Sequence, residues 1–348
     1  MDHDSPAGAG AGADYRLHRF DDVTLQSGVR LPAVSLAYRS WGELAPARDN
    51  FVLFPTWFGS THRNNEWLIG PGRALDPARY FIVSINLLGN GLSSSPSNTP
   101  VPFDRRRFPS ISMLDNVRLQ ARLLDEVFGV DLPALVIGRS MGAQFAFQWG
   151  SYLPERTRRL FCLCGSARTT PHNRVFLDGI KAALTADCAW RDGEYAAPPI
   201  KGLQAVGRLY AGWAMSPDFY RQQLYRREGC DDVDDYVAAR WRDNFIARDA
   251  NDLLSMIATW QSFDPSHNER YRGDWQAAMA AIDCPAIVMP SRTDLYFPPE
   301  DSAVAVAAMP RAELRVIESA WGHRAGSPNS DPADVDFVDR AIGELLSA

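Results

Sequence analysis

The stretch ALVIGRSMGAQFAFQWG, residues 134–150, places an apolar run directly before a glycine-rich turn and an aromatic-rich segment. Its first residues are typical of a short buried strand, and the large side chains that recur on one face after residue 142 predict a helix. Between them, residues 138–142 read GRSMG and match G-x-S-x-G, the sharp strand-to-helix turn called the nucleophile elbow.

The serine at the centre of this turn is the candidate nucleophile. Gly138 and Gly142 have no Cβ, so the strand and the helix can approach closely while Ser140 adopts a strained backbone conformation. The strain exposes the Oγ atom above the helix N-terminus, which favours developing negative charge. The alternative is an ordinary glycine-rich turn in which the serine only caps the helix. A strand before the motif and a helix after it are the context that the motif requires, and they favour the nucleophile.

Composition narrows the class of protein. The chain has 348 residues, of which 46% are hydrophobic and 22% charged, so it can bury a sizeable core and is expected to be globular. A formal net charge of -6 and an isoelectric point near 5.6 give no reason to expect nucleic acid or an anionic membrane as a partner. No run of about eighteen apolar residues predicts a membrane-spanning helix.

Cysteines and short motifs add three expectations. The five cysteines form no C-x-x-C pair, so a reduced, cytoplasmic compartment is the default expectation. Residues 1–14, MDHDSPAGAGAGAD, are acidic and lack an apolar segment, so we expect a flexible tail and not a signal peptide. The sequence contains neither a G-x-x-x-x-G-K-[ST] phosphate loop nor an H-E-x-x-H motif, and we expect no cofactor and no metal.

Strand-like and helix-like segments alternate along most of the chain. Residues 15–167 and 281–348 are predicted to form an α/β-hydrolase core, with a mostly parallel sheet flanked by helices, because near-continuous apolar runs suit strands buried on both faces. Residues 168–280 show helical periodicity and no convincing strand, and we interpret them as a helical cap inserted into the core. An antiparallel pair around Gly28 precedes the strands predicted at 51–55, 80–86, 134–138, 160–165, 286–291 and 314–318.

A serine nucleophile requires an imidazole that takes its proton. In this fold the three groups follow the chain order Ser, then Asp or Glu, then His. Four of the six histidines lie in the tail or before the last core strands, and His267 lies in the predicted cap. His323, in the loop ESAWGHRAG just after the last predicted strand, is therefore the candidate base.

The carboxylate that orients this imidazole should follow the preceding strand. Asp294 lies a few residues past the strand predicted at 286–291, whereas Asp283 lies before that strand, at the wrong end of the sheet. Asp301 is better explained as an acid in the first turn of a helix. Ligands of open α/β sheets gather outside the carboxyl ends of the strands, where the three predicted groups would converge.

A tetrahedral intermediate also needs donors for its oxyanion. One is the backbone N–H of Met141, the residue after the nucleophile. The second should come from the loop TWFGSTHRNNEW that follows the strand at 51–55, where Trp57 is the best candidate. Loss of one such donor typically raises the barrier by about 3 kcal/mol.

Longer stretches resemble the homoserine O-acetyltransferase family of α/β-hydrolase-fold proteins. The resemblance implies a triad of Ser140, Asp294 and His323, an acyl-serine intermediate in a ping-pong mechanism, and a helical cap that mediates dimerisation. Trp57 and Met141 match its oxyanion positions. It also implies that Arg208 takes the place of the cap arginine that holds the homoserine carboxylate. The stretches are YRSWGEL, WLIGPGRALDPARYFIVSINLLGNGLSSSPSN, GRSMGAQ, RTDLYFPPED and WGHRAG, and they cover almost the whole chain.

The chain departs from this family beside the candidate base. Arg324 stands where the transferases carry an Asp directly after the catalytic His. A cation at this place would repel the amino group of homoserine by about 4 kcal/mol at contact range in an effective dielectric of 20. With Arg139 in the elbow and a changed oxyanion loop, the chain is similar to a side branch of the family that includes esterases of short alkyl acetates.

The sequence therefore predicts a serine hydrolase that cleaves small carboxylic esters, with acetyl or short alkyl groups. The family resemblance also implies a homodimer that forms through the cap. One alternative is an acetyl-CoA-dependent O-acetyltransferase that uses homoserine or another hydroxylated acceptor. A second alternative is a non-catalytic binding protein on the same scaffold. The triad does not separate the hydrolase from the transferase, because the same acyl-enzyme serves both reactions.

Overall fold

The computed structural model describes residues 14–191 and 193–348, so residues 1–13 of the predicted tail lie outside the described residues. Its centre is an eight-stranded sheet with the strand order β1-β2-β4-β3-β5-β6-β9-β10. β2 pairs antiparallel with β1 and β4, and all later neighbours pair in parallel. The strands are β1 (Arg16–Thr24), β2 (Arg30–Trp41), β3 (Phe51–Leu53), β4 (Phe81–Ile85), β5 (Leu135–Arg139), β6 (Leu160–Leu163), β9 (Ala286–Met289) and β10 (Ala312–Leu314).

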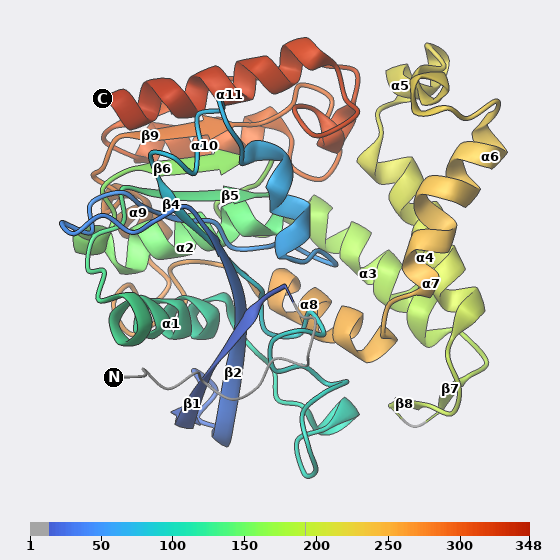
Figure 1. The fold of residues 1–348 in the computed structure, drawn as a ribbon. Helices are drawn as coiled ribbons and strands as arrows, with labels where there is room; N and C mark the ends of the chain where they lie inside the picture. Colours follow the sequence, from blue (N-terminus) through green and yellow to red (C-terminus); the bar gives the residue numbers. More distant parts are fainter. Residues whose placement is uncertain (1–13, 192) are drawn as a thin grey trace.

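Helices cover both sides of this sheet (Figure 1). α11 (Pro332–Ser347) lies on one side, and α1 (Met113–Leu123) and α2 (Met141–Tyr152) lie on the other. α9 (Trp275–Ala280) packs against α2, and α10 (Pro299–Ala308) packs against β10. The shorter helical segments are η1 (His62–Leu68), η2 (Arg105–Arg107), η3 (Leu124–Phe128), η4 (Pro154–Arg156), η5 (Leu224–Glu228), η6 (Ala238–Arg242) and η7 (Gly322–Arg324). The α/β-hydrolase fold predicted from the sequence is thus the fold of the chain.

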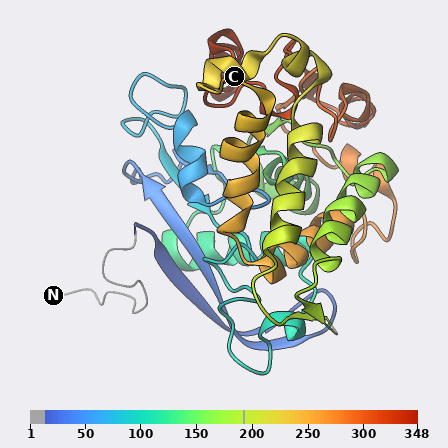
Figure 2. The same ribbon diagram turned by 90° about the vertical axis from the view of Figure 1, so that its right-hand side faces the viewer.

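Between β6 and α9 the chain forms a group of helices that stands beside the sheet (Figure 1) and faces the viewer in Figure 2. We call this group the cap helices; its predicted boundaries, residues 168 and 280, remain a prediction. The segment also holds a small hairpin of β7 (Trp190–Arg191) and β8 (Glu194–Tyr195), which the sequence did not reveal because each strand has only two residues. The cap helices are α3 (Pro171–Thr185), α4 (Ile200–Ala214), α5 (Pro217–Arg221), α6 (Val233–Val237), α7 (Asp243–Ile246) and α8 (Ala250–Gln261).

Most strands coincide with the apolar runs that predicted them. β3, β4, β5, β6 and β9 begin and end within two residues of the predicted limits, and β5 is buried along its whole length. The predicted limits of the last strand were wrong, because β10 ends at Leu314. Beyond it, Arg315 still donates a backbone hydrogen bond to Val288, and Ile317 forms an isolated bridge to Ser291. The antiparallel pair turns at Gly28, whose φ of 84° favours glycine.

Three glycines allow strand and helix to meet at the elbow. A Cβ on Gly138 would lie 2.0 Å from the carbonyl O of Gly142, and a Cβ on Gly165 would lie 2.6 Å from the carbonyl O of Ser140. A Cβ on Gly142 would lie 3.1 Å from the carbonyl O of Thr56, in the loop after β3. The elbow is therefore packed directly against the neighbouring backbone. At these three positions there is room for the hydrogen atom of glycine but not for a Cβ.

Gly138→Ala is expected to lower the melting temperature, because the new methyl group overlaps the backbone of α2 and the turn must shift. Gly179→Ala is the matched control: it lies within α3, and a Cβ there meets no atom within 4 Å. In a helix interior alanine is favoured over glycine by about 1 kcal/mol, so this variant should be as stable as the parent or more stable. Thermal unfolding followed by circular dichroism measures the melting temperatures of the parent and of both variants. A melting temperature of Gly138→Ala equal to that of the parent would contradict the account of the elbow.

Candidate active site

Ser140 sits at the apex of the elbow, between β5 and α2. Its backbone has φ 56° and ψ -128°, a region that L-residues rarely adopt, so the strain expected of a nucleophile elbow is present. Ser140 occupies the N-cap position of α2, yet its side chain makes no capping hydrogen bond. Its Oγ instead lies 2.9 Å from Nε2 of His323. The hydroxyl is therefore engaged by an imidazole and not by the helix.

The second ring nitrogen of His323 faces Asp294. Nδ1 lies 2.7 Å from Oδ2 of Asp294, whose side chain is completely buried. The other carboxylate oxygen, Oδ1, accepts hydrogen bonds from the backbone N–H groups of Tyr296 and Phe297 at 2.8 and 3.2 Å. With the carboxylate fixed in this way, Nδ1 carries the proton and Nε2 is left to accept one from the Ser140 hydroxyl. The structure thus brings together the three residues predicted from the sequence.

The loop that carries His323 is held by the cap helices. Gly322, the residue before it, has φ 58°. A Cβ at this position would lie 2.5 Å from the carbonyl O of Ala214, at the end of α4. Ser216, just beyond α4, donates a hydrogen bond from its hydroxyl to the carbonyl O of Ala320. The position of the imidazole therefore depends on contact between the core and the cap helices.

Burial keeps His323 in its neutral form. Loss of hydration lowers the pKa of this imidazole below its usual value, and this effect outweighs the charge of Asp294, which raises the pKa. The nearby cation Arg139 lowers the pKa further. A neutral imidazole at pH 7 is the form that can take a proton from serine.

The two predicted oxyanion donors differ in their surroundings. Met141 is the first residue of α2, where a backbone N–H has no acceptor within the helix. Trp57 lines the cavity together with Ser140, but its N–H donates to Oγ of Ser60 at 2.7 Å. Ser60 also donates from Oγ to the carbonyl O of Trp57 at 2.9 Å. The Trp57 N–H becomes available to an oxyanion only when the Ser60 hydroxyl releases it.

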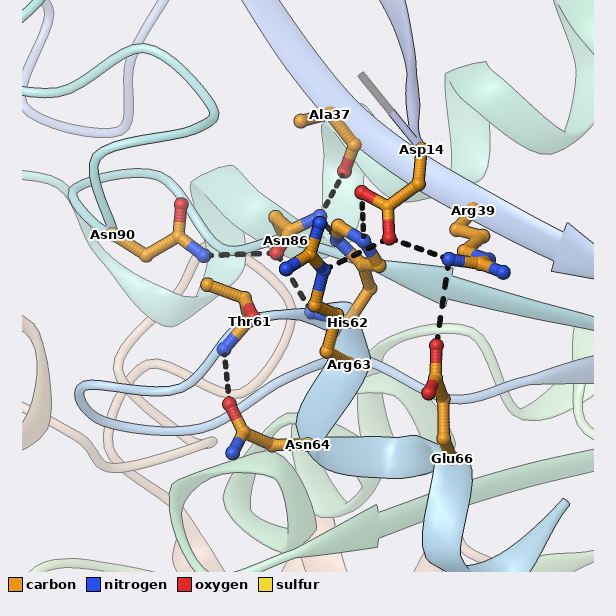
Figure 3. Close-up of polar contacts among 10 residues, drawn as sticks. All are labelled: Asp14, Ala37, Arg39, Thr61, His62, Arg63, Asn64, Glu66, Asn86 and Asn90. Carbon is orange, nitrogen blue, oxygen red and sulfur yellow. Dashed lines mark hydrogen bonds and ion pairs between the residues drawn. The ribbon is translucent and has the colours of Figure 1, made fainter. Parts of the chain in front are cut away.

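A buried polar network supports the loop that holds Trp57 (Figure 3). Nδ2 of Asn90 donates to the carbonyl O of Ser60 at 3.1 Å and to Oδ1 of Asn86 at 3.1 Å. Asn86 also accepts the backbone N–H of His62 at 3.0 Å and donates to the carbonyl O of Ala37 at 3.0 Å. This chain of bonds ties the loop after β3 to β2 and to the loop after β4.

His62 has a structural place in the same network. Its Nδ1 accepts from Asn86 at 3.1 Å, so Nε2 carries the proton and donates to Asp14 at 3.2 Å. Asp14 also accepts from Arg63 at 2.8 Å and from Arg39 at 2.5 Å, as Figure 3 shows. The hydrogen bond from Arg63, more than any other group, lowers the pKa of Asp14 well below its usual range. Chain order had excluded His62 as the base, and its two ring nitrogens are both committed here.

The Ser140 hydroxyl and His323 open onto a cavity of about 300 Å³. Eight of the 21 residues that line it are Phe, Tyr or Trp. The loop after β3, the cap helices and the segment after β9 all contribute to the wall. Phe58 stacks on Tyr210 with ring centroids 5.7 Å apart, and Tyr296 packs edge-on against His323 at 4.6 Å. The aromatic members of the wall include Trp57, Phe58, Tyr210, Trp241, Trp260 and Tyr296.

Arg139 is a site residue that the sequence marked only as a departure from the family. Its Nη2 donates to the backbone carbonyl of His323 at 2.8 Å, and its guanidinium carbon lies 5.2 Å from the centre of the Trp57 ring. One side chain of the elbow therefore contacts both the loop of the base and the loop of the oxyanion donor. Because Arg139 directly precedes Ser140 in the sequence, a role at the site could have been predicted for it.

The two predicted substrate-binding arginines lie in different places. Arg324 lines the cavity, and its Nη1 lies 2.6 Å from a buried carboxylate, that of Glu228, which offsets part of its charge. Arg208 is exposed on α4, bonds the carbonyl O of Gln204 at 3.2 Å and is not part of the cavity wall. Tyr210 faces the cavity from the same helix, and residues two positions apart on a helix do not share a face. The sequence did not indicate Arg248, which enters the wall between α7 and α8.

Within residues 14–191 and 193–348 we find no group of three or more His, Cys, Asp or Glu side chains that could hold a metal ion. In the same part of the chain, no helix is long and apolar enough to cross a membrane.

Comparison with known proteins places the chain in a family. The profile of the α/β hydrolase fold matches residues 49–326. The chain belongs to the α/β hydrolase family. An ethyl acetate hydrolase from Pseudomonas veronii is 33% identical and aligns over 96% of both chains. The crystal structure of an acetylester hydrolase from Corynebacterium glutamicum, 34% identical, superposes with a TM-score of 0.93 over 96% of both chains. A homoserine O-acetyltransferase from Clavibacter michiganensis is 32% identical over 96% of this chain and 92% of its own.

In this hydrolase, Asp294→Asn is expected to lower the turnover number about 10⁴-fold, because an amide favours the wrong imidazole tautomer. Asp301→Asn is the control: this acid lies in the first turn of α10, half-buried, and should leave turnover nearly unchanged. Steady-state hydrolysis of a chromogenic acetate measures both variants. If Asp301→Asn removed activity and Asp294→Asn kept it, the choice of carboxylate would be wrong.

The pH profile tests the state of His323. Because the neutral imidazole is the active form, kcat/KM should fall only as the pH drops through the lowered pKa, below the usual value of 6.5. Arg139→Met removes a cation that lowers this pKa, so the acidic limb should move to higher pH. Arg139→Lys keeps the charge and should leave the limb near its original place. Identical acidic limbs in the parent and the methionine variant would refute the electrostatic contact.

Proposed function

We propose that this α/β hydrolase is a carboxylic ester hydrolase that acts on small acetyl esters through an acyl-serine intermediate. The observation that carries the proposal is the hydrogen-bonded series Ser140–His323–Asp294. Its first two members, Ser140 and His323, line a cavity of about 300 Å³. A cavity of this size admits a small ester. The names of the ethyl acetate hydrolase and the acetylester hydrolase, which align along nearly the whole chain, support the same substrate class.

The first half of the reaction transfers the acyl group to serine. Oγ of Ser140 attacks the ester carbonyl carbon while Nε2 of His323 takes its proton, and the imidazolium is stabilised by Asp294. The N–H of Met141 faces the oxyanion from the N-terminus of α2, and the N–H of Trp57 joins it once it leaves Ser60. The tetrahedral intermediate collapses, the C–O bond to the alcohol breaks, and His323 returns the proton to the leaving alcohol.

The second half regenerates the enzyme. A water molecule gives a proton to His323 and attacks the acetyl-serine carbonyl. Collapse of the second tetrahedral intermediate releases acetate, and the proton on His323 returns to Oγ of Ser140. The burial that keeps His323 neutral supports both proton transfers, since the imidazole must start each half-reaction unprotonated.

An O-acetyltransferase would use the same acetyl-serine but would bring in an amino-acid acceptor in place of water. The cavity wall disfavours such an acceptor. Arg324 lies in it beside His323, and the described part of the chain places no Asp or Glu in the wall to bind an ammonium group. Water is therefore the acceptor in our proposal.

Cellular location and assembly complete the proposal. We place the enzyme in the cytoplasm because all five cysteines are free, and four of them are buried. We propose a homodimer through the cap helices, where Val175 and Ile200 are exposed apolar side chains. Light scattering coupled to size-exclusion chromatography tests the dimer, and a monomer at all concentrations would refute it.

The decisive experiment compares two reactions of one preparation. We expect ethyl acetate or a similar short acetate to be hydrolysed, and Ser140→Ala to remove this activity without loss of the fold. Acetyl-CoA with homoserine should give little or no O-acetylhomoserine. Faster acetylation of homoserine than hydrolysis of acetates would overturn the hydrolase assignment, and full activity of Ser140→Ala would overturn the nucleophile.

A further inference from the structure

The wall of the catalytic cavity carries a concentration of positive charge. Among the described residues it contains Arg139, Arg248 and Arg324 and neither an Asp nor a Glu. This contrasts with the net charge of -6 of the whole chain. Positive groups that line a low-dielectric cleft focus the potential and attract an anion.

Only one of these arginines has a carboxylate in contact, as far as the described residues go. Arg324 pairs with Glu228 at 2.6 Å, and the same carboxylate also pairs with Arg240 at 3.4 Å. One negative charge is therefore shared by two cations. No carboxylate of residues 14–191 or 193–348 lies within ion-pair distance of Arg139 or Arg248.

Neutral oxygens take the hydrogen bonds of the two unpaired arginines. Arg139 donates to the carbonyl O of His323, and Arg248 donates to the carbonyl O of Gly59 and, at 3.3 Å, to the side chain of Asn244. A carbonyl satisfies a donor but does not neutralise a charge. Burial of a cation that has no carboxylate in contact is costly, and burial lowers the pKa of both Arg139 and Arg248. The charge of Asp294 opposes this effect at Arg139 but does not outweigh it.

The same wall holds donors that the described residues leave without an acceptor. They are Nε of Arg139 and the indole Nε1 of Trp260. Arg139 is 7% exposed and Trp260 1% exposed. Indole and guanidinium N–H groups can only donate, so the described part of the surrounding protein leaves these two groups unsatisfied. The arginines of the wall that lack a carboxylate in contact within the described chain complement a ligand that supplies negative charge.

We propose that the ester cleaved by this hydrolase carries a carboxylate on its alcohol part, so that the substrate is the acetyl ester of a short hydroxycarboxylic acid. This inference rests on the proposed function. The acyl carbon must lie at Oγ of Ser140, and the acetyl methyl group is uncharged. The charge therefore belongs to the alcohol, which extends toward the cap segment that carries Arg248. A guanidinium matches the two oxygens of a carboxylate better than any other side chain does.

The balance of the reaction is that of any ester hydrolysis. The acyl C–O bond breaks, water supplies the hydroxyl of acetate and the proton of the alcohol, and the products are acetate and a hydroxycarboxylate. The carboxylate of the substrate takes no part in bond making. Its binding to the arginines orients the ester carbonyl toward Ser140, so its effect should be seen in kcat/KM.

The test compares 3-acetoxypropanoate with 3-acetoxypropanamide, which has the same shape without the charge. A charge-assisted hydrogen bond predicts that kcat/KM for the anion exceeds that for the amide by about tenfold or more at low salt. The ratio should decrease as salt is added, because part of the interaction is screened. In the parent enzyme, 3-hydroxypropanoate should also inhibit more strongly than 3-hydroxypropanamide. The proposal would be overturned if kcat/KM for the anion were equal to or lower than that for the amide and if 3-hydroxypropanoate and 3-hydroxypropanamide inhibited equally.

Two variants locate the binding group. Arg248→Met should reduce the ratio of anion to amide toward one, and Arg248→Lys, which keeps the charge, should retain part of it. Arg208→Met is the matched control, because it removes the same charge from the exposed side of α4, outside the cavity. An equal loss of the ratio in Arg208→Met and Arg248→Met would show that the preference comes from long-range charge alone and would contradict binding by Arg248.

The outcome also separates this inference from the proposed function. If the amide and short neutral acetates are hydrolysed with dependence on Ser140 but the anion is not preferred, only the carboxylate inference fails. If neither compound nor any short acetate is hydrolysed, the hydrolase assignment itself fails.

Discussion

A hydrogen bond of 2.9 Å between Oγ of Ser140 and Nε2 of His323 joins two residues that lie 183 positions apart in the chain. Two backbone turns must be correct at the same time for it to form. The elbow requires Gly138 and its glycine partners, and the loop of the base requires Gly322, whose hydrogen faces the end of α4. The close packing of the elbow glycines therefore maintains the strained conformation of Ser140, and the end of α4 holds the loop of the base that faces it.

The second constraint is electrostatic. An imidazole that must accept a proton cannot be charged at rest, and burial together with Arg139 keeps the pKa of His323 low. The same arginine holds the loops on either side of the nucleophile, so charge and geometry are coupled in one side chain. Arg248 and Arg324 extend the positive wall into the cavity. In our proposal, the reaction and the choice of substrate depend on neighbouring parts of this cationic surface.

Sequence was sufficient for the features that depend on local pattern. The apolar runs and the spacing of glycines around Ser140 predicted the sheet and the elbow. Chain order, together with the predicted limits of the tail and the cap, separated His323 from the five other histidines. These rules work because parallel strands end at one edge of the sheet, and residues in the loops beyond that edge must meet there. The assignment of Asp294 depended on the same argument.

The wall of the cavity could not be predicted in this way. Which face of α4 points inward depends on how the cap helices pack, and the structure turns Tyr210 inward and Arg208 outward. The pairing of Arg324 with Glu228 joins residues 96 positions apart. The bond from the Trp57 N–H to Ser60 depends on the exact path of one loop. No periodicity in the sequence reports such contacts.

The most direct test of the account is to trap the acyl-enzyme. The protein is mixed with excess chromogenic acetate and quenched in acid within the first turnovers, and its peptides are then mapped by mass spectrometry. The account predicts one added acetyl group, located on the peptide that contains Ser140, and its disappearance when the substrate is exhausted. An acetyl group on another residue, or hydrolysis at full rate with no acetylated peptide at any time, would contradict the central role of Ser140.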